Sequence, residues 1–131
     1  MEPTADAAAP IGARLPAPVE AAIDLAHLAR MTLGERDLEA EVLALFDRQA
    51  AVLLAHMRNC APAAVAAFAH TLKGSARGIG AWRIAAAADA VEKNAVARNA
   101  GGVADAVARL AAAVEEAKAV IADRLQTRPG L

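Results

Sequence analysis

The residue of this sequence whose surroundings most favour a reaction is His70. An unperturbed imidazole has a pKa of about 6.5, so a large neutral, nucleophilic fraction exists at neutral pH. Lys73 follows three residues later and Gly74 four, which places both on the histidine side of a helix. The lysine could contact an anion attached to the ring. A mid-helix glycine costs about 1 kcal/mol relative to alanine, so Gly74 needs a local reason, and close approach of a partner is such a reason. From exposure alone, His70 could equally be an ordinary surface histidine.

Other residues that could bind a metal or act in catalysis lack the additional ligands or catalytic partners that these roles require. Asp24 and His27 have helical i, i+3 spacing, but a metal site in a bundle requires a matching second pair. His56 and Cys60 supply two ligands at most, which is too few for a closed zinc site. Ser75 lies five residues after His70 and faces the opposite side of a helix, so the two cannot form a hydroxyl–imidazole pair. We therefore expect no metal site and no catalytic serine.

The helix that must carry His70 is predicted over residues 61–80. An apolar stripe at helical spacing consists of Val65, Phe68, Leu72, Ala76 and Ile79. His70 points away from this stripe. Small or cationic residues share its side, namely Ala63, Ala66, Ala67, Lys73, Gly74 and Arg77. Long charged side chains are usual on a solvated helix face, so we expect Ala63, Ala66, Ala67 and Arg77 to form a surface on which a partner docks.

Four further helices are predicted around it. A proline-rich flexible tail, residues 1–18, precedes a short helix over residues 19–31. A long helix over residues 35–57 has an apolar stripe made of Leu38, Val42, Leu45, Phe46, Leu53 and Met57. Its acids Glu35, Asp37, Glu39, Glu41 and Asp47 mostly occupy other faces.

The second half of the chain continues the helical pattern. Residues 81–98 form a helix whose inner side consists of Ile84, Ala87, Ala88, Val91 and Ala95. Residues 99–102, which include Gly101 and Gly102, break the chain before a helix over residues 103–125. Its seam contains Val103, Val107, Leu110, Val114, Ala117 and Ile121. Trp82 falls on an outer side, where it either caps the bundle end or belongs to a docking surface, and we favour the cap.

Together these helices predict an all-α domain, an antiparallel up-down four-helix bundle with a short extra N-terminal helix, over residues 19–126. Residues 127–131 form a C-terminal tail. Hydrophobic residues make up 57% of the 131 residues and aromatic residues 2%, which suits closely packed helices and disfavours strands. The net charge of -1 favours neither nucleic acid nor an anionic membrane. One cysteine and the absence of a long apolar run lead us to expect a soluble, cytoplasmic monomer.

The spacing of several of these residues is similar to that of a known family. The sequence contains His70-Thr71-Leu72-Lys73-Gly74-Ser75-Ala76, then Ile79-Gly80-Ala81, Ile84 and Val91-Glu92. This pattern, over residues 70–92, resembles the signature of histidine-containing phosphotransfer (Hpt) domains of multistep phosphorelays. Gly78 and Trp82 depart from the usual pattern. The helical layout extends the resemblance to about residues 19–126.

The resemblance implies a four-helix bundle whose exposed histidine accepts a phosphoryl group from a receiver-domain aspartate and passes it to another. His70 would be phosphorylated, Lys73 would be the cation beside the phosphoryl group, and Gly74 would admit the receiver. The implied partners are response-regulator receiver domains, including those of hybrid histidine kinases. The receiver would supply Mg²⁺, which is consistent with the expected absence of a carboxylate cluster around His70, and we expect no intrinsic cofactor and no nucleotide-binding segment in this chain. The protein would be a phosphocarrier that acts only with partner receivers, not a complete kinase.

A second interpretation assigns the same bundle to a different class of protein. A non-phosphorylated adaptor or inhibitor that binds a receiver or a histidine kinase would have identical helices. The intact set of His70, Lys73 and Gly74 argues against it. A metal or redox bundle is the third interpretation, and it lacks ligands.

Overall fold

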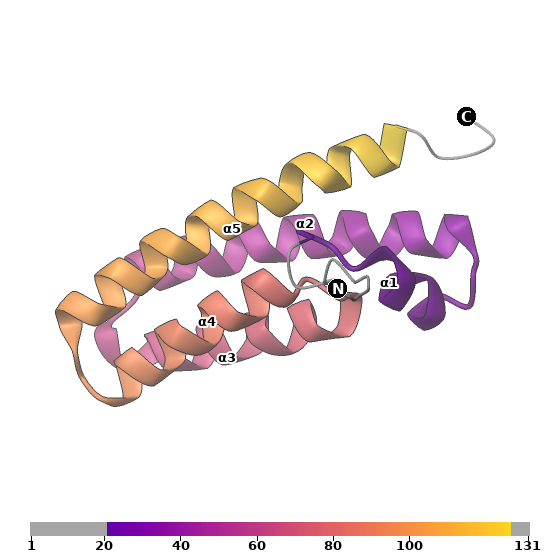
Figure 1. Ribbon diagram of the computed structural model, residues 1–131. Coiled ribbons are helices and arrows are strands. Elements are labelled where there is room, and N and C mark those ends of the chain that lie inside the picture. Colours follow the sequence, from indigo (N-terminus) through magenta and orange to yellow (C-terminus); the bar gives the residue numbers. More distant parts are fainter. Residues whose placement is uncertain (1–20, 127–131) are drawn as a thin grey trace, which may run out of the picture.

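The computed structural model describes residues 21–126, and within this range every regular element is a helix. The expected tail over residues 1–18 and the tail over residues 127–131 lie outside the described residues. The helices are α1 (Leu25–Met31), α2 (Arg36–Asn59), α3 (Pro62–Ile79), α4 (Trp82–Val96) and α5 (Ala100–Gln126). Helices α2 to α5 run alternately up and down as a four-helix bundle, and α1 lies across one end (Figure 1). The predicted fold class is confirmed.

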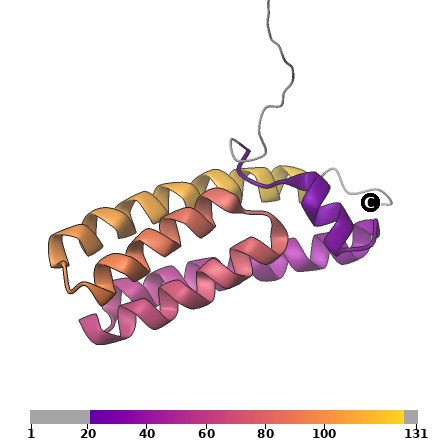
Figure 2. The same cartoon turned by 60° about the horizontal axis from the view of Figure 1, so that its bottom comes forward.

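Each long helix packs against two others, which closes the bundle around one core. Helix α3 contacts α2 and α4, and α5 contacts α4 and α2, as Figure 2 shows from a second side. Alanines with no exposed surface lie in α3 and α4, namely Ala69, Ala76 and Ala88. Single-carbon side chains at these positions let α3 and α4 approach closely, while larger residues such as Leu43, Leu72 and Leu110 fill the centre.

The buried face of α2 differs from the prediction. Leu45 is 58% exposed and Leu38 38% exposed, whereas Leu43, Ala50 and Leu54 are buried. Helix α2 packs against both α3 and α5, so the centre of its buried face lies on the side of Leu43. The predicted apolar stripe lay along one edge of this face. In α3 the same kind of shift leaves Phe68 half-buried and places Ala69 in the core.

An acidic residue that was expected on an outer face lies inside the bundle. Glu39 is only 3% exposed. Its carboxylate accepts hydrogen bonds from Arg124 of α5, at 2.6 Å from Nε to Oε2 and 3.2 Å from Nη2 to Oε1. Arg36, one helical turn earlier, lies 3.6 Å from Oε2. The two-point contact with Arg124 explains how a carboxylate is accommodated between α2 and α5.

Two helices begin at other residues than predicted, because a side chain caps each of them. Helix α5 begins at Ala100, not at residue 103, because the Oδ1 atom of Asn99 accepts a hydrogen bond from the backbone N–H of Gly102 at 3.1 Å. The predicted break at Gly101 and Gly102 is therefore wrong, and both glycines lie in the first turn. Helix α1 begins at Leu25 because Asp24 caps it, accepting from the N–H of His27 at 3.1 Å.

Trp82 caps the end of the bundle, as the sequence favoured. Its Nε1–H donates to Oδ2 of Asp24 at 3.0 Å, and its ring lies 4.9 Å from the ring of His27. These contacts fix α1 onto the α3–α4 connection. The hydrogen bond from Trp82 and that from the backbone of His27 lower the pKa of Asp24. Gly80 ends α3 with φ of 85°, and a Cβ atom there would lie 3.0 Å from the carbonyl oxygen of Asp24.

Across the described range, no helix has both the length and the apolar character needed to span a membrane.

Candidate functional site

His70 lies in the middle of α3 with its side chain 67% exposed. Its Nδ1 atom lies 3.0 Å from Oε2 of Glu92, which projects from the neighbouring helix α4. An ionised carboxylate only accepts hydrogen bonds, so this contact places the proton of a neutral imidazole on Nδ1. The lone pair then lies on Nε2, the nitrogen that makes no hydrogen bond to any described residue. The geometry therefore presents Nε2 as the nucleophilic atom.

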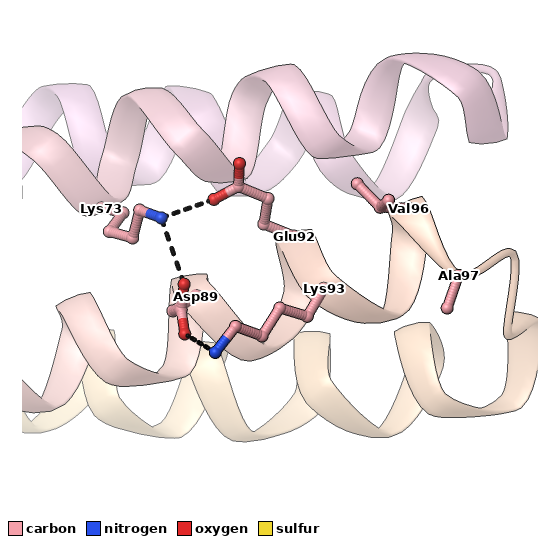
Figure 3. A pocket seen from close by; sticks show the side chains of 6 residues that line it. All are labelled: Lys73, Asp89, Glu92, Lys93, Val96 and Ala97. Carbon is pink, nitrogen blue, oxygen red and sulfur yellow. Dashed lines mark hydrogen bonds and ion pairs between the residues drawn. The ribbon is translucent and has the colours of Figure 1, made fainter.

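Lys73 lies beside His70 and is held by two carboxylates of α4. Its Nζ atom lies 2.7 Å from Oε1 of Glu92 and 3.1 Å from Oδ1 of Asp89 (Figure 3). The contact with Asp89 is a hydrogen bond, while that with Glu92 is a close ion pair whose oxygen is buried and lacks a well-directed donor. The side chain of Lys73 is only 13% exposed. Its ammonium is thus fixed between the two acids and does not extend into solvent.

The charges of this cluster shift one another's titration. Contacts with Glu92 and then Asp89 raise the pKa of Lys73. The same ammonium lowers the pKa of Glu92, and the hydrogen bond with His70 lowers it further. Lys93 is the largest cause of the lowered pKa of Asp89, followed by Lys73; Lys93 Nζ lies 3.0 Å from Oδ2 of Asp89. At neutral pH the carboxylates of Asp89 and Glu92 are therefore ionised and the ammonium of Lys73 is charged.

Two residues of this cluster were missed from the sequence. We expected no carboxylate cluster around His70, but Glu92 contacts His70 and Asp89 contacts the neighbouring Lys73. They lie on the next helix, and only the register of α4 against α3 brings them to His70 and Lys73. A signal was present, because Asp89 and Glu92 have i, i+3 spacing and so share a helix face.

The surface next to His70 is open at Gly74, as predicted. A Cβ atom built on Gly74 would meet no heavy atom within 4 Å. Ala63, Ala67 and Arg77 are exposed and Ala66 is half-buried, so these four also lie at the surface of α3. On the α4 side, a shallow groove of about 330 Å³ is lined by Lys73, Asp89, Glu92, Lys93, Val96 and Ala97 (Figure 3). Small residues and this groove leave the imidazole accessible from outside the bundle.

The other two histidines of the described residues, His27 and His56, pack against aromatic side chains. His27 packs on Trp82, and its Nε2 lies 3.2 Å from the carbonyl oxygen of Gly78. His56 of α2 stacks on Phe68 of α3, with ring centroids 5.0 Å apart and an interplanar angle of 15°. Among residues 21–126, no group of three or more histidine, cysteine, aspartate or glutamate side chains could hold a metal ion.

Comparison with known families gives one match. The model of the Hpt domain matches residues 35–123, which contain α2, α3, α4 and most of α5. Searches of curated proteins and of solved structures found no match to this chain. The match includes His70 and both helices that form its surroundings, whereas α1 lies outside it.

Proposed function

Because the chain belongs to the Hpt domain family, whose members are histidine phosphotransfer modules of two-component phosphorelays, we propose that His70 carries the phosphoryl group. The donor is the phosphorylated aspartate of a receiver domain, and the acceptor is the aspartate of another receiver. The observation that carries this assignment is the contact between Nδ1 of His70 and Glu92, which in the neutral imidazole leaves the lone pair on Nε2 of a side chain that is 67% exposed.

The transfer requires little chemistry from this chain beyond the placement of one nitrogen. The lone pair of Nε2 attacks phosphorus in line with the bond to the aspartyl oxygen; the N–P bond forms and the P–O bond breaks. The electrons of the broken bond return to the aspartate of the receiver as a carboxylate. No proton has to leave His70, because the phosphorylated ring is an imidazolium whose Nδ1–H still faces Glu92. The second transfer reverses these steps on another receiver.

Charge stabilisation is shared between the two proteins. On this chain, Lys73 lies beside the histidine, and an arriving phosphoryl group competes with Glu92 and Asp89 for its ammonium. Mg²⁺ bound by the receiver would neutralise phosphoryl oxygens during transfer.

The receiver reaches His70 over the small residues of α3. Gly74 leaves open space one helical turn after the histidine. Ala63, Ala66, Ala67 and Arg77 extend the same side of the helix and complete the proposed docking surface. We propose that the protein acts as a monomer in the cytoplasm, with receivers that include those of hybrid histidine kinases.

Phosphoryl transfer from labelled receivers tests this function. Purified full-length protein is mixed with candidate receiver domains carrying radioactive phosphate on aspartate, with Mg²⁺ present. The wild type and a His56→Gln control should acquire label, and His70→Gln should acquire none while its helical circular dichroism stays unchanged. If the wild type binds a phosphorylated receiver yet never acquires label, the adaptor interpretation replaces the carrier.

A further inference from the structure

A second, larger groove lies at the end of the bundle opposite α1. It has a volume of about 960 Å³ and is lined by residues next to the α2–α3 and α4–α5 connections. Figure 1 shows that both connections lie at the end of the bundle away from α1. Its walls come from the last turn of α2, the first turns of α3 and α5, and the end of α4. His70, Lys73, Asp89 and Glu92 do not line it, so it is separate from the phosphotransfer cluster.

The groove is apolar because small side chains leave the bundle end unfilled. Alanines face it from three helices, among them Ala66 of α3, Ala95 of α4 and Ala104 of α5. Met57, Cys60 and aliphatic residues form the rest of its apolar surface, and one of the aliphatic residues, Val96, is 71% exposed. No aromatic ring fills the space. Grooves of this volume between the helices of a bundle commonly accept small apolar ligands.

The polar groups of the groove carry charge of one sign. Arg58 at the end of α2 and Arg98 after α4 line it, and no acidic side chain does. Both arginines are exposed, and neither forms an ion pair or a side-chain hydrogen bond with a described residue. Guanidinium groups bind carboxylates through two parallel hydrogen bonds. An apolar wall with two unengaged guanidinium groups is complementary to an apolar molecule with an anionic head.

We propose that this groove binds a single-chain aliphatic carboxylate, with the chain against the alanines and the carboxylate on Arg58 and Arg98. The proposal is independent of the phosphotransfer function. Ala63 and Ala66 line the groove and also belong to the proposed docking surface of α3. A bound carboxylate would therefore lie one to two helical turns from His70.

Calorimetric titration of the protein tests the proposal. The two titrants are decanoate and decyltrimethylammonium, a cation with an alkyl chain of similar length. Decanoate should bind saturably at one molecule per chain, and the cation roughly tenfold more weakly or not at all, because the arginines repel it. The double variant Arg58→Gln/Arg98→Gln should lose about the same factor for decanoate. Arg48→Gln, a surface arginine of α2 outside the groove, should bind like the wild type.

A second pair of variants separates the groove from the rest of the surface. Ala104→Phe fills the groove from an exposed position of α5 and should abolish decanoate binding, while Ala108→Phe, one turn later and outside the groove, should not. Equal binding of decanoate and the cation, or unchanged binding in the Arg58/Arg98 variant, would overturn the proposal. Dimers in sedimentation that dissociate in Ala104→Phe would assign the groove to a second copy instead. Loss of receiver transfer in that variant, without decanoate binding by the wild type, would assign it to the receiver.

Discussion

At His70, the partner of one ring nitrogen decides which nitrogen can react. The helical spacing of the sequence was sufficient to predict that this histidine faces outward, because residues two positions away on either side lie on the buried side of α3. The tautomer could not be predicted in the same way. It depends on Glu92, which is 22 residues away and reaches His70 only when α3 and α4 pack in register.

Replacing Glu92 should change the tautomer of the His70 imidazole and leave the fold intact. In the wild type, ¹⁵N NMR of neutral His70 should show the proton on Nδ1. Glu92→Ala removes the acceptor, so the ring should become a mixture of tautomers, and transfer from a receiver should slow by several-fold. Glu92→Gln keeps a neutral acceptor and should retain the Nδ1–H tautomer. If Glu92→Ala left the tautomer unchanged, Glu92 would not position the ring.

Substitutions at Gly74 should distinguish an effect on receiver docking from an effect on folding. No atom lies within 4 Å of a Cβ placed there, so Gly74→Ala should raise the free energy of unfolding by up to about 1 kcal/mol through helix propensity. Gly74→Gln should also fold, but its side chain would stand between the imidazole and an approaching receiver and reduce transfer by about a hundredfold. A small phosphodonor should still phosphorylate His70 in both variants. Unfolding of Gly74→Gln in a thermal melt would contradict the open surface at this position.

At the scale of helices, the hydrophobic periodicity was sufficient to predict which segments are helical, whereas capping side chains determine where some of the helices begin. The His70 helix was predicted to within about a residue at each end, since Pro62 suits its first turn and Gly80 its end. The buried face of α2 was misplaced at Leu45 because the direction of that face is set by α3 and α5 together. Glu39 was assigned to the outside because a buried carboxylate is identifiable only once its cation, Arg124, is known to lie opposite.

The pair of Glu39 and Arg124 should hold α2 against α5. Arg124→Ala leaves the carboxylate of Glu39, 4% exposed as a side chain, with only the more distant Arg36. The free energy of unfolding measured in urea should then fall by about 2 to 3 kcal/mol. The double variant Glu39→Leu/Arg124→Leu removes both charges and should recover much of the loss. Equal stability of Arg124→Ala and the wild type would show that the ion pair contributes nothing.

For the whole molecule, composition and periodicity were enough for the fold class, since alanine-rich amphipathic segments joined by short connections can pack as a bundle. The position of α1 needed more information. Trp82 and Asp24 are 58 residues apart, and their hydrogen bond joins segments that no local pattern relates. Alanine content likewise did not show where the bundle would be tight, at Ala69 and Ala76, or where it would leave a groove.

The acidic cluster should make stability depend on pH in a defined direction. Folding lowers the pKa values of Asp89 and Glu92, so their stabilising contribution is present above the unfolded values near pH 4 and is lost as pH falls through the folded values. Folding raises the pKa of Lys73, so its contribution is present below its unfolded value and is lost at strongly alkaline pH. Urea midpoints of the wild type and Asp89→Asn/Glu92→Gln should therefore converge below about pH 4. A difference that stays constant down to about pH 3 would contradict the assigned shifts.

The most direct test of the central claim is to identify the atom that carries phosphorus. Full-length protein labelled with ¹⁵N on histidine is phosphorylated by a receiver and studied by ¹⁵N and ³¹P NMR. We predict a single phosphohistidine, at Nε2 of His70, with Nδ1 still protonated toward Glu92. Phosphorus on Nδ1 of His70, or on His27 or His56, would contradict the account.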